Sequence, residues 1–300
     1  MDERGRGVAA QGAFGPKLII ALLILLPTCW TLSGAAPETN WSPLGDALTA
    51  ENAGLFVGVN DYPKETILPL KFSVNDAVAQ AEMFVMRLKL IPAQRCHLLL
   101  AGSPTARYAP RLKALQDAGA VVVPSAGRAT ILFHLETVRR LSSGSNSLLI
   151  VSFSGHGNEY RETPYFIPSD GLAGIPSSFL SLTTDVANNL ATTGRQKRLL
   201  FIDACRLDFA PGQKGNYRLP EVTAAFRQAF AETRGLVTLA SCGAGQASLE
   251  DPRSESGVFT GKLLTALEEG IGAVDSEFIT LGQVSAYLKI AVPKRAAELA

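Results

Sequence analysis

The sequence is poor in several residue types, and each shortage limits what the protein can be. Only four of its 300 residues are cysteine and three are histidine, which is too few for a fold held together by disulfides. Lys and Arg together number 28 against 27 for Asp and Glu. A chain so evenly charged has no bulk positive field to hold a nucleic acid or an anionic membrane surface. Any charge selectivity must therefore come from a local pocket.

Long apolar runs are also scarce, and the one near the start is short. Residues 18–26 form an unbroken apolar stretch that ends at Pro27, which is too short to span a membrane comfortably. Basic residues precede this stretch and a Ser33-x-Ala35 pattern of small residues follows it, as in a signal peptide. We therefore expect residues 1–36 to be a signal peptide that directs export to the periplasm or the medium. The alternative is an uncleaved membrane anchor.

The rest of the chain is long enough for one large domain. Residues 37–52 contain Pro37, Pro43 and Gly45 and show little periodicity, so we expect a linker there. Residues 53–300 then form a single domain with one substantial core, because 47% of the sequence is apolar.

Within that domain, short β-rich runs alternate with stretches of helical spacing. The expected strands are 54–59, 97–100, 147–153, 198–202 and 235–240, with a further short one at 120–123. The expected helices are 74–88, 130–141, 180–190, 221–231 and 259–267. This alternation predicts βαβ units. The fold class is therefore α/β, with a mainly parallel central sheet and helices on both of its faces.

Two of the expected strands are followed by residues that can carry chemistry. A Ser-Gly-His-Gly motif (154–157) follows one strand, and an Asp-Ala-Cys-Arg motif (203–206) follows the next. The carboxyl ends of neighbouring parallel strands meet at one edge of a sheet, so we expect the loop residue His156 within a few ångströms of Cys205. A thiolate is the nucleophile of cysteine chemistry, and a nearby imidazole generates or stabilises it. Taken alone, each residue has a simpler alternative, a polar loop histidine or an inert buried cysteine.

The other cysteines outside the signal peptide, Cys96 and Cys242, each lie beside an apolar run. A small buried hydrophobe is the usual role at such a position, and a disulfide between the two is the alternative. Three cysteines in an exported protein leave at least one free thiol unless chains pair with each other. This favours a catalytic thiol at Cys205.

The two motifs resemble those of the caspase and metacaspase peptidases, whose histidine precedes the cysteine by roughly fifty residues. The resemblance covers residues 54–287 and implies the three-layer caspase-like sandwich. Other stretches are similar to the family's first strand, to the start of its first helix, and to the strand and helix after the nucleophile. These stretches are 56–62, 74–77, and 238–242 with 257–260.

The resemblance implies a role for each motif residue. Cys205 would attack the scissile carbonyl, and His156 would supply a proton to the departing amine. The backbone N–H groups of Gly157 and Cys205 would form the oxyanion hole. The implied activity is that of a cysteine endopeptidase acting on proteins or peptides, with no metal or organic cofactor.

Specificity separates the branches of this family, because caspases cleave after aspartate and metacaspases after arginine or lysine. The chain has Leu70 where a caspase would hold an arginine, and Asp203 where caspases usually carry glutamine. By resemblance to metacaspases, Asp76 is a second acidic pocket residue, and Ser73 and Ser154 line the pocket. Two carboxylates in a partly desolvated pocket select a cation. We therefore expect cleavage after Arg or Lys.

Both pocket acids also have structural alternatives. Asp76 could be a favourable charge at the start of a helix, and Asp203 could orient a loop through hydrogen bonds. Metacaspases that respond to calcium carry an acidic cluster, of which only Asp170, Asp185 and Asp208 remain here as candidates. This argues against calcium dependence and leaves calcium activation as the alternative.

Two other functions stay open at this point. The chain could be a catalytically silent caspase-like scaffold or interaction module, against which the intact pair of His156 and Cys205 argues. It could also be an aspartate-specific caspase, against which the acidity of the pocket argues.

Overall fold

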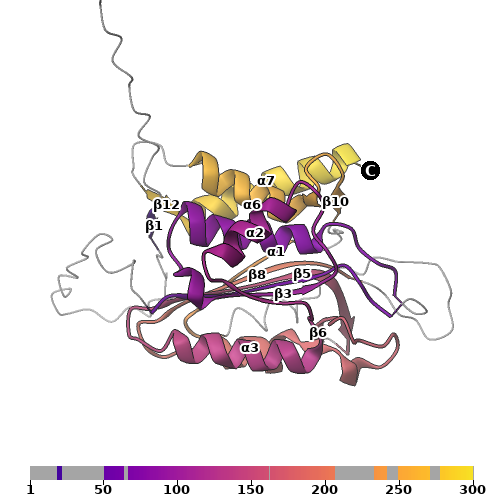
Figure 1. Cartoon of the computed structure of the whole chain (residues 1–300), viewed down its shortest axis with the longest axis horizontal. Helices are drawn as coiled ribbons and strands as arrows, with labels where there is room; N and C mark the ends of the chain where they lie inside the picture. Colours follow the sequence, from indigo (N-terminus) through magenta and orange to yellow (C-terminus); the bar gives the residue numbers. More distant parts are fainter. Residues whose placement is uncertain are drawn as a thin grey trace, which may run out of the picture.

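The computed structural model describes residues 19–21, 51–63, 67–161, 163–206, 233–241, 249–270 and 278–299. An eight-stranded sheet forms the middle layer, with helices on both sides of it (Figure 1). The strands of this sheet are β2 (Ala53–Val59), β3 (Cys96–Ala101), β4 (Val121–Val123), β5 (Leu148–Tyr160), β6 (Thr163–Phe166), β7 (Leu180–Ser181), β8 (Lys197–Arg206) and β9 (Leu236–Ala240). The α-helices are α1 (Ser73–Glu82), α2 (Ala109–Asp117), α3 (Arg128–Leu141), α4 (Asn188–Leu190), α6 (Val258–Glu269) and α7 (Leu281–Leu299).

Other helical turns extend or connect these elements. Two are π-helical, one continuing α1 and one leading into α4, and two are short 3₁₀ turns. They are η1 (Met83–Arg87), η4 (Leu182–Ala187), η2 (Ala93–Arg95) and η3 (Pro176–Ser178).

Six strands of the sheet are parallel and follow the order β4-β3-β2-β5-β8-β9. Every residue of β2 and β3 is buried, as parallel strands covered on both faces require. The longest strand, β5, pairs with β2 along its first part and with β8 along most of its length. Beyond the end of β2, residues 157–160 of β5 pair antiparallel with β6, which in turn pairs with β7.

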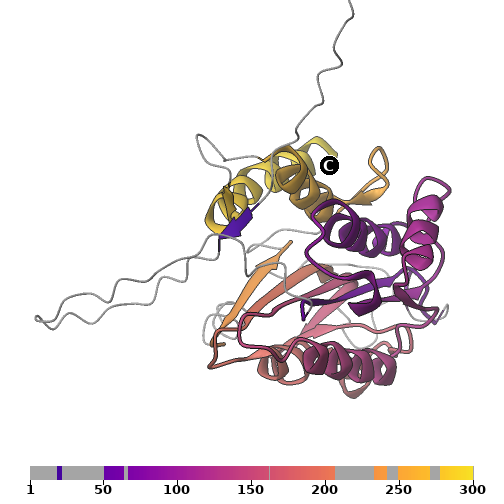
Figure 2. The same ribbon diagram turned by 60° about the vertical axis from the view of Figure 1, so that its left-hand side comes forward.

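The two faces of the sheet carry separate apolar cores. Leu55 and Val57 of β2 pack in the core that α3 covers, whereas Phe56 packs in the core that α1, α6 and α7 cover. This division follows from the alternation of side chains along a strand. The views in Figures 1 and 2 show α3 on one face of the sheet and α1, α2, α6 and α7 on the other.

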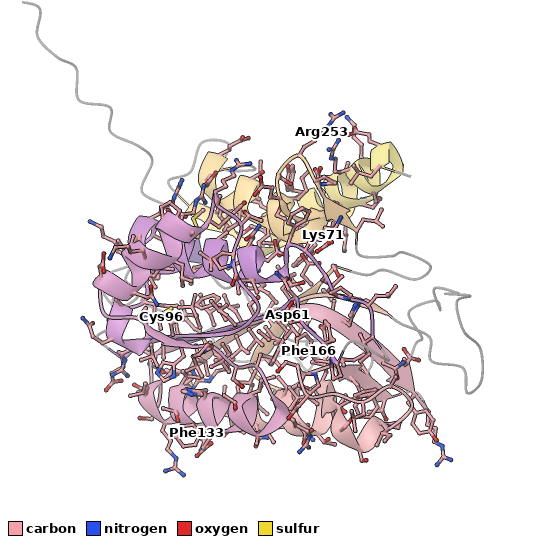
Figure 3. The ribbon with its side chains drawn as sticks, turned by 45° about the vertical axis from the view of Figure 1, so that its right-hand side comes forward. Asp61, Lys71, Cys96, Phe133, Phe166 and Arg253 are labelled. Atoms are coloured by element: carbon pink, nitrogen blue, oxygen red, sulfur yellow. The ribbon has the colours of Figure 1, made fainter. Side chains whose placement is uncertain are left out.

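All six parallel strands end at the same edge of the sheet. Asp61, just beyond β2, and Phe166, the last residue of β6, lie toward this end in Figure 3, whereas Cys96, the first residue of β3, lies toward the other. Ligands of α/β sheets bind at the carboxyl ends of the strands. We therefore expect a binding site among the residues at or just beyond the ends of β2, β5 and β8.

Two small strand pairs lie outside the main sheet. The hairpin of β10 (Glu250–Asp251) and β11 (Ser256–Gly257) leads directly into α6. The short β1 (Ile19–Ala21) pairs in parallel with β12 (Phe278–Thr280), next to α7 (Figure 2). In the part of the chain that the structure describes, no helix combines the length and the hydrophobicity needed to cross a membrane.

The fold class expected from the sequence is confirmed, with one helix wrongly placed. The expected helix at 180–190 begins as strand β7, because Leu180 pairs with Phe166, and helical turns start only at Leu182. Helices α2 and α7 were not among the elements expected from the sequence. The expected helix at 221–231 and most of residues 1–52 lie outside the described residues, so the signal peptide and the linker stay predictions.

Candidate active site

The register between β5 and β8 brings the two sequence motifs together. Ser154 lies opposite Asp203, and His156 lies opposite Cys205. Neighbouring strands are about 4.8 Å apart, so the backbones of His156 and Cys205 are as close as two strands allow. Of Cys205 and Arg206 the structure describes the backbone alone.

His156 is part of a strand rather than of a loop, which corrects the expectation from the sequence. The apolar run ends at Phe153, but β5 continues through the Ser-Gly-His-Gly motif to Tyr160. This extension is possible because β6 and β8 pair with this part of β5. Pairing with β8, and the hydrogen bond of 2.9 Å that the His156 carbonyl accepts from the Ile167 N–H, hold this backbone more firmly than a loop would. The His156 side chain is only 4% exposed.

One ring nitrogen of His156 has a fixed partner. Nε2 lies 2.8 Å from the carbonyl oxygen of Leu68. A carbonyl only accepts, so Nε2 carries the proton and Nδ1 of the neutral ring carries the lone pair. Nδ1 is buried and has no hydrogen-bond partner among the described groups. The ring therefore presents a free basic nitrogen.

Burial keeps this imidazole neutral. Desolvation lowers the pKa of His156 to about 4, and the hydrogen bond to the Leu68 carbonyl opposes that shift in part. Below neutral pH the ring consequently stays uncharged over a wider range than a histidine in water does.

Tyr62 fixes the backbone and the ring of His156 from the end of β2. Its hydroxyl oxygen accepts a hydrogen bond of 2.8 Å from the backbone N–H of His156, and the two rings lie 4.9 Å apart. A Cβ atom at Gly155 would come within 2.8 Å of this hydroxyl and 2.9 Å of the Phe166 ring. Glycine before the histidine thus makes room for the tyrosine.

The segment that carries the Leu68 carbonyl is tied down on two sides. Asn60 receives the Val74 N–H on its side-chain oxygen and donates its amide to the Lys71 carbonyl, at 3.1 Å each. From the β10–β11 hairpin, Glu250 accepts the N–H groups of Lys71 and Phe72 at 2.8 and 2.7 Å. The acceptor that orients His156 therefore belongs to an anchored segment, although the Leu68 side chain itself is largely exposed.

The two predicted pocket acids lie next to each other at the beginning of α6. Asp203 accepts both the N–H and the hydroxyl of Thr260, at 3.0 and 2.7 Å. Asp76 accepts the Gly257 N–H at 2.9 Å and the Ser154 hydroxyl at 2.8 Å. Backbone N–H groups at a helix start are unpaired donors with a positive dipole, which stabilises carboxylates there.

Glycine at position 257 is required by the closeness of these carboxylates, because a Cβ atom there would collide with Asp203 and touch Asp76. Asp76 is 2% exposed and Asp203 is 4% exposed. Burial raises the pKa of Asp76 well above its ordinary value, and the charge of Asp203 raises it further. The pair therefore holds a proton more readily than two separate carboxyl groups would.

The remaining predicted site residues are Ser73, Ser154 and Gly157. Ser154 is linked to the acidic pair through its hydrogen bond to Asp76. Ser73 begins α1 and is buried. Gly157 lies opposite Arg206 on one side and Phe166 on the other, one residue beyond the pair of His156 and Cys205.

Two of the acidic residues considered for calcium have structural partners elsewhere. Asp170 accepts the backbone N–H of Arg128, and Asp185 forms an ion pair with the Arg128 side chain, both at 2.9 Å. These contacts fix the start of α3. Asp208 lies outside the described residues, and within them no group of three or more His, Cys, Asp or Glu side chains is arranged to hold a metal ion.

Sequence reasoning missed several residues that position this site. The role of the Leu68 carbonyl could not be predicted from the sequence, because every residue has a backbone carbonyl. Tyr62 and Asn60 belong to the stretch similar to the family's first strand, and Thr260 and Gly257 belong to the stretch similar to its later helix. The likeness of those two stretches to the family assigned no role to these residues. In the structure Tyr62 binds the backbone of His156, and Gly257 and Thr260 bind the two carboxylates.

Comparison with known proteins agrees with this architecture. The family model for the caspase domain, Peptidase C14, matches residues 52–282. The chain therefore belongs to the caspase family. Caspase domains are cysteine peptidases, which hydrolyse peptide bonds in protein or peptide substrates.

A solved structure also matches the chain, but with low similarity. The crystal structure of caspase-1 from Spodoptera frugiperda matches with a TM-score of 0.43 and 12% identity, covering 85% of this chain and 82% of that chain. The assignment rests on the family model and not on this match. No curated protein gives a significant sequence match.

The buried carboxyl pair predicts an unusual dependence of stability on pH. Because the pKa of Asp76 is raised in the folded state, the folded protein binds a proton that the unfolded chain releases, so stability falls as pH rises above about 4. Asp76→Asn keeps an oxygen to accept the Gly257 N–H but cannot ionise. We expect the free energy of unfolding of Asp76→Asn, minus that of the parent, to increase from pH 4 to pH 8. Urea unfolding of both proteins across this range measures this difference. A difference that stays constant with pH would contradict the raised pKa of Asp76.

Proposed function

We propose that the protein is a cysteine endopeptidase that uses His156 and Cys205 as a catalytic dyad and cleaves after Arg or Lys. The observation that carries this proposal is the register that places Cys205 opposite His156. It is supported by the hydrogen bond between Nε2 and the Leu68 carbonyl, which leaves Nδ1 as the base.

In the first half of the reaction, Nδ1 takes the proton from the Cys205 thiol. The thiolate then attacks the scissile carbonyl carbon and forms a C–S bond. When the C–N bond breaks, the protonated Nδ1 gives its proton to the leaving amine. The product of this half is a thioester between the enzyme and the new carboxyl end of the substrate.

In the second half, water replaces the thiol. Nδ1 removes a proton from a water molecule, whose oxygen attacks the thioester carbon, and the C–S bond breaks to release the acid and the thiolate. Backbone N–H groups at Gly157 and Cys205 would stabilise the negative oxygen in both halves, and one such donor is worth about 3 kcal/mol.

A backbone carbonyl takes the place that a carboxylate holds in a serine triad. The Leu68 carbonyl fixes the tautomer and the ring orientation, as the aspartate of a triad does, but it carries no charge. It therefore stabilises a protonated imidazole less than a carboxylate would. A cysteine nucleophile tolerates this, because a thiol loses its proton more easily than a hydroxyl.

The acidic pair beside the dyad supports specificity for basic residues. By strand alternation, position 205 lies on the same side of β8 as Asp203, and Ser154 links β5 to Asp76. A substrate guanidinium or ammonium would relieve the repulsion between the two carboxylates, whereas a substrate aspartate would add to it. Leu70, two residues after the carbonyl that binds His156, offers no positive charge for an aspartate.

The pocket acids are buried in the structure, and this has a consequence for binding. A cationic side chain would have to replace the proton that the pair favours and share hydrogen bonds now made by Gly257 and Thr260. Binding of Arg or Lys is therefore coupled to release of a proton, so affinity for a basic substrate should rise with pH as the pair ionises.

The dyad is tested by removing each member. We expect Cys205→Ala and His156→Ala to lower kcat by at least about a thousandfold on a peptide substrate. Cys96→Ala is the matched control, because Cys96 is a free thiol buried at the far end of β3, where burial raises its pKa. Steady-state kinetics with purified variants checks the expectation, after circular dichroism has shown that each is folded. Near-parental activity of either dyad variant, or loss of activity in folded Cys96→Ala, would rule out this assignment.

Specificity is tested at Asp203. On fluorogenic peptides ending in Arg, Lys or Asp, we expect the parent to prefer Arg and Lys. Asp203→Asn keeps an acceptor for Thr260 but removes a charge, and should lower kcat/KM for Arg peptides on the order of a hundredfold. Asp117→Asn, on the exposed side of α2, is the matched control and should leave the preference unchanged. A parent that prefers Asp, or an Asp203→Asn variant with the full Arg preference, would refute the acidic pocket.

A further inference from the structure

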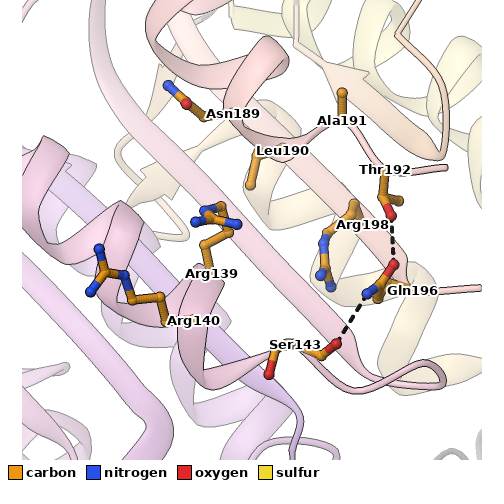
Figure 4. A pocket seen from close by; sticks show the side chains of 9 residues that line it. All are labelled: Arg139, Arg140, Ser143, Asn189, Leu190, Ala191, Thr192, Gln196 and Arg198. Carbon is orange, nitrogen blue, oxygen red and sulfur yellow. Dashed lines mark hydrogen bonds between the residues drawn. The ribbon is translucent and has the colours of Figure 1, made fainter. Parts of the chain in front are cut away.

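A pocket at the opposite end of the sheet from His156 has a positive lining. It has a volume of about 420 Å³ and lies between the end of α3, the start of β8 and the loop that precedes β8 (Figure 4). Three arginines line it, Arg139 and Arg140 of α3 and Arg198 of β8. None of its lining residues is acidic.

Arg198 is a buried cation without a carboxylate partner among the described residues. It is 5% exposed. Its Nη2 donates to the Ser142 carbonyl at 2.7 Å, and its Nη1 donates to the Ser142 hydroxyl at 3.0 Å and the Lys197 carbonyl at 3.4 Å. These bonds join it to the carboxyl end of α3, whose dipole offsets part of the charge. They use three of the five N–H groups of a guanidinium.

The neighbouring arginines share a single negative charge. Both Arg139 and Arg140 pair with Glu136, at distances of 2.6 to 2.9 Å. The three arginines that line the pocket therefore have one carboxylate partner between them, and it pairs with Arg139 and Arg140 but not with Arg198. Desolvation, together with the nearby charge of Arg139, lowers the pKa of Arg198 to about 10.

The polar wall of the pocket is organised before any ligand arrives. Gln196 donates to the Ser143 carbonyl at 3.0 Å and accepts from the Thr192 hydroxyl at 2.5 Å (Figure 4). These bonds hold the loop before β8 against the end of α3. The pocket therefore has a fixed shape and needs little reorganisation to bind a ligand.

We propose that this pocket binds a small soluble anion that carries a phosphate group. A phosphate offers three acceptor oxygens and close to two negative charges, which matches the excess of two guanidinium charges better than a carboxylate does. The volume lies within the range of small-molecule sites. Arg198 lies seven positions before Cys205 along β8, a distance of roughly 23 Å, so the site is distinct from the proposed dyad and does not depend on it.

Isothermal titration calorimetry with pyrophosphate, at constant ionic strength set by potassium chloride, tests the proposal. We expect saturable binding at one site per chain, tighter than binding of citrate. Arg139→Gln, at the surface of α3, should weaken binding by at least about tenfold, and Arg198→Gln should abolish it if that variant folds. The matched control is Arg87→Gln, which removes an arginine that pairs with Glu268 outside the pocket.

The outcomes distinguish a specific anion-binding site from nonspecific electrostatic binding to surface arginines. Loss of binding in Arg139→Gln with retention in Arg87→Gln supports the proposal, whether or not Arg198→Gln is stable. Absence of saturable binding to the parent would overturn it, as would equal weakening in Arg139→Gln and Arg87→Gln. Citrate binding as tight as that of pyrophosphate would overturn the assignment to a phosphate.

Discussion

The parallel pairing of β5 with β8 is the constraint on which the candidate active site depends. It runs from Leu148 opposite Lys197 to Gly157 opposite Arg206, and it alone puts the histidine motif beside the cysteine motif. Side chains alternate between faces, so a shift of one residue would move one motif to the other side of the sheet. The apolar residues buried along both strands make such a shift costly. The core thus sets the register, and the register sets the distance between His156 and Cys205.

The start of α6 is the second feature that positions the site residues. It holds two buried carboxyl groups together, which lowers the stability of the protein. Its free N–H groups hold Asp203 and Asp76, while Ser154 connects Asp76 to the strand that carries the histidine. Two carboxylates so close and so deeply buried repel each other. A protein selected for stability alone would not keep both, and functional sites are where such costs are retained. The proposed preference for a basic substrate gives this arrangement a reason.

The sequence was sufficient for those features that depend on local pattern. The apolar runs predicted β2, β3, β5 and β8 because buried parallel strands are apolar on both faces. The run at 235–240 also predicted β9, of whose residues only Leu236 is buried. Pattern failed where a partner distant in the sequence decides the structure. Strand β5 continues through polar residues to Tyr160 because β6 pairs with it, and residues 180–181 form a strand because Phe166 lies opposite Leu180. Likewise the backbone carbonyl of Leu68, which belongs to a separate segment, accepts the hydrogen bond from His156. Every residue has such a carbonyl, so the residue type could not predict this contact.

The central claim is that Cys205 is the nucleophile activated by His156, and covalent labelling tests it most directly. A peptidyl-arginine acyloxymethyl ketone reacts with an activated thiol held next to a bound arginine side chain. After incubation with the parent protein, peptide mass mapping should find one adduct, on Cys205, and the adduct should be absent from folded His156→Ala. An adduct on Cys96 or Cys242, or equal labelling of Cys205 without the histidine, would contradict the account.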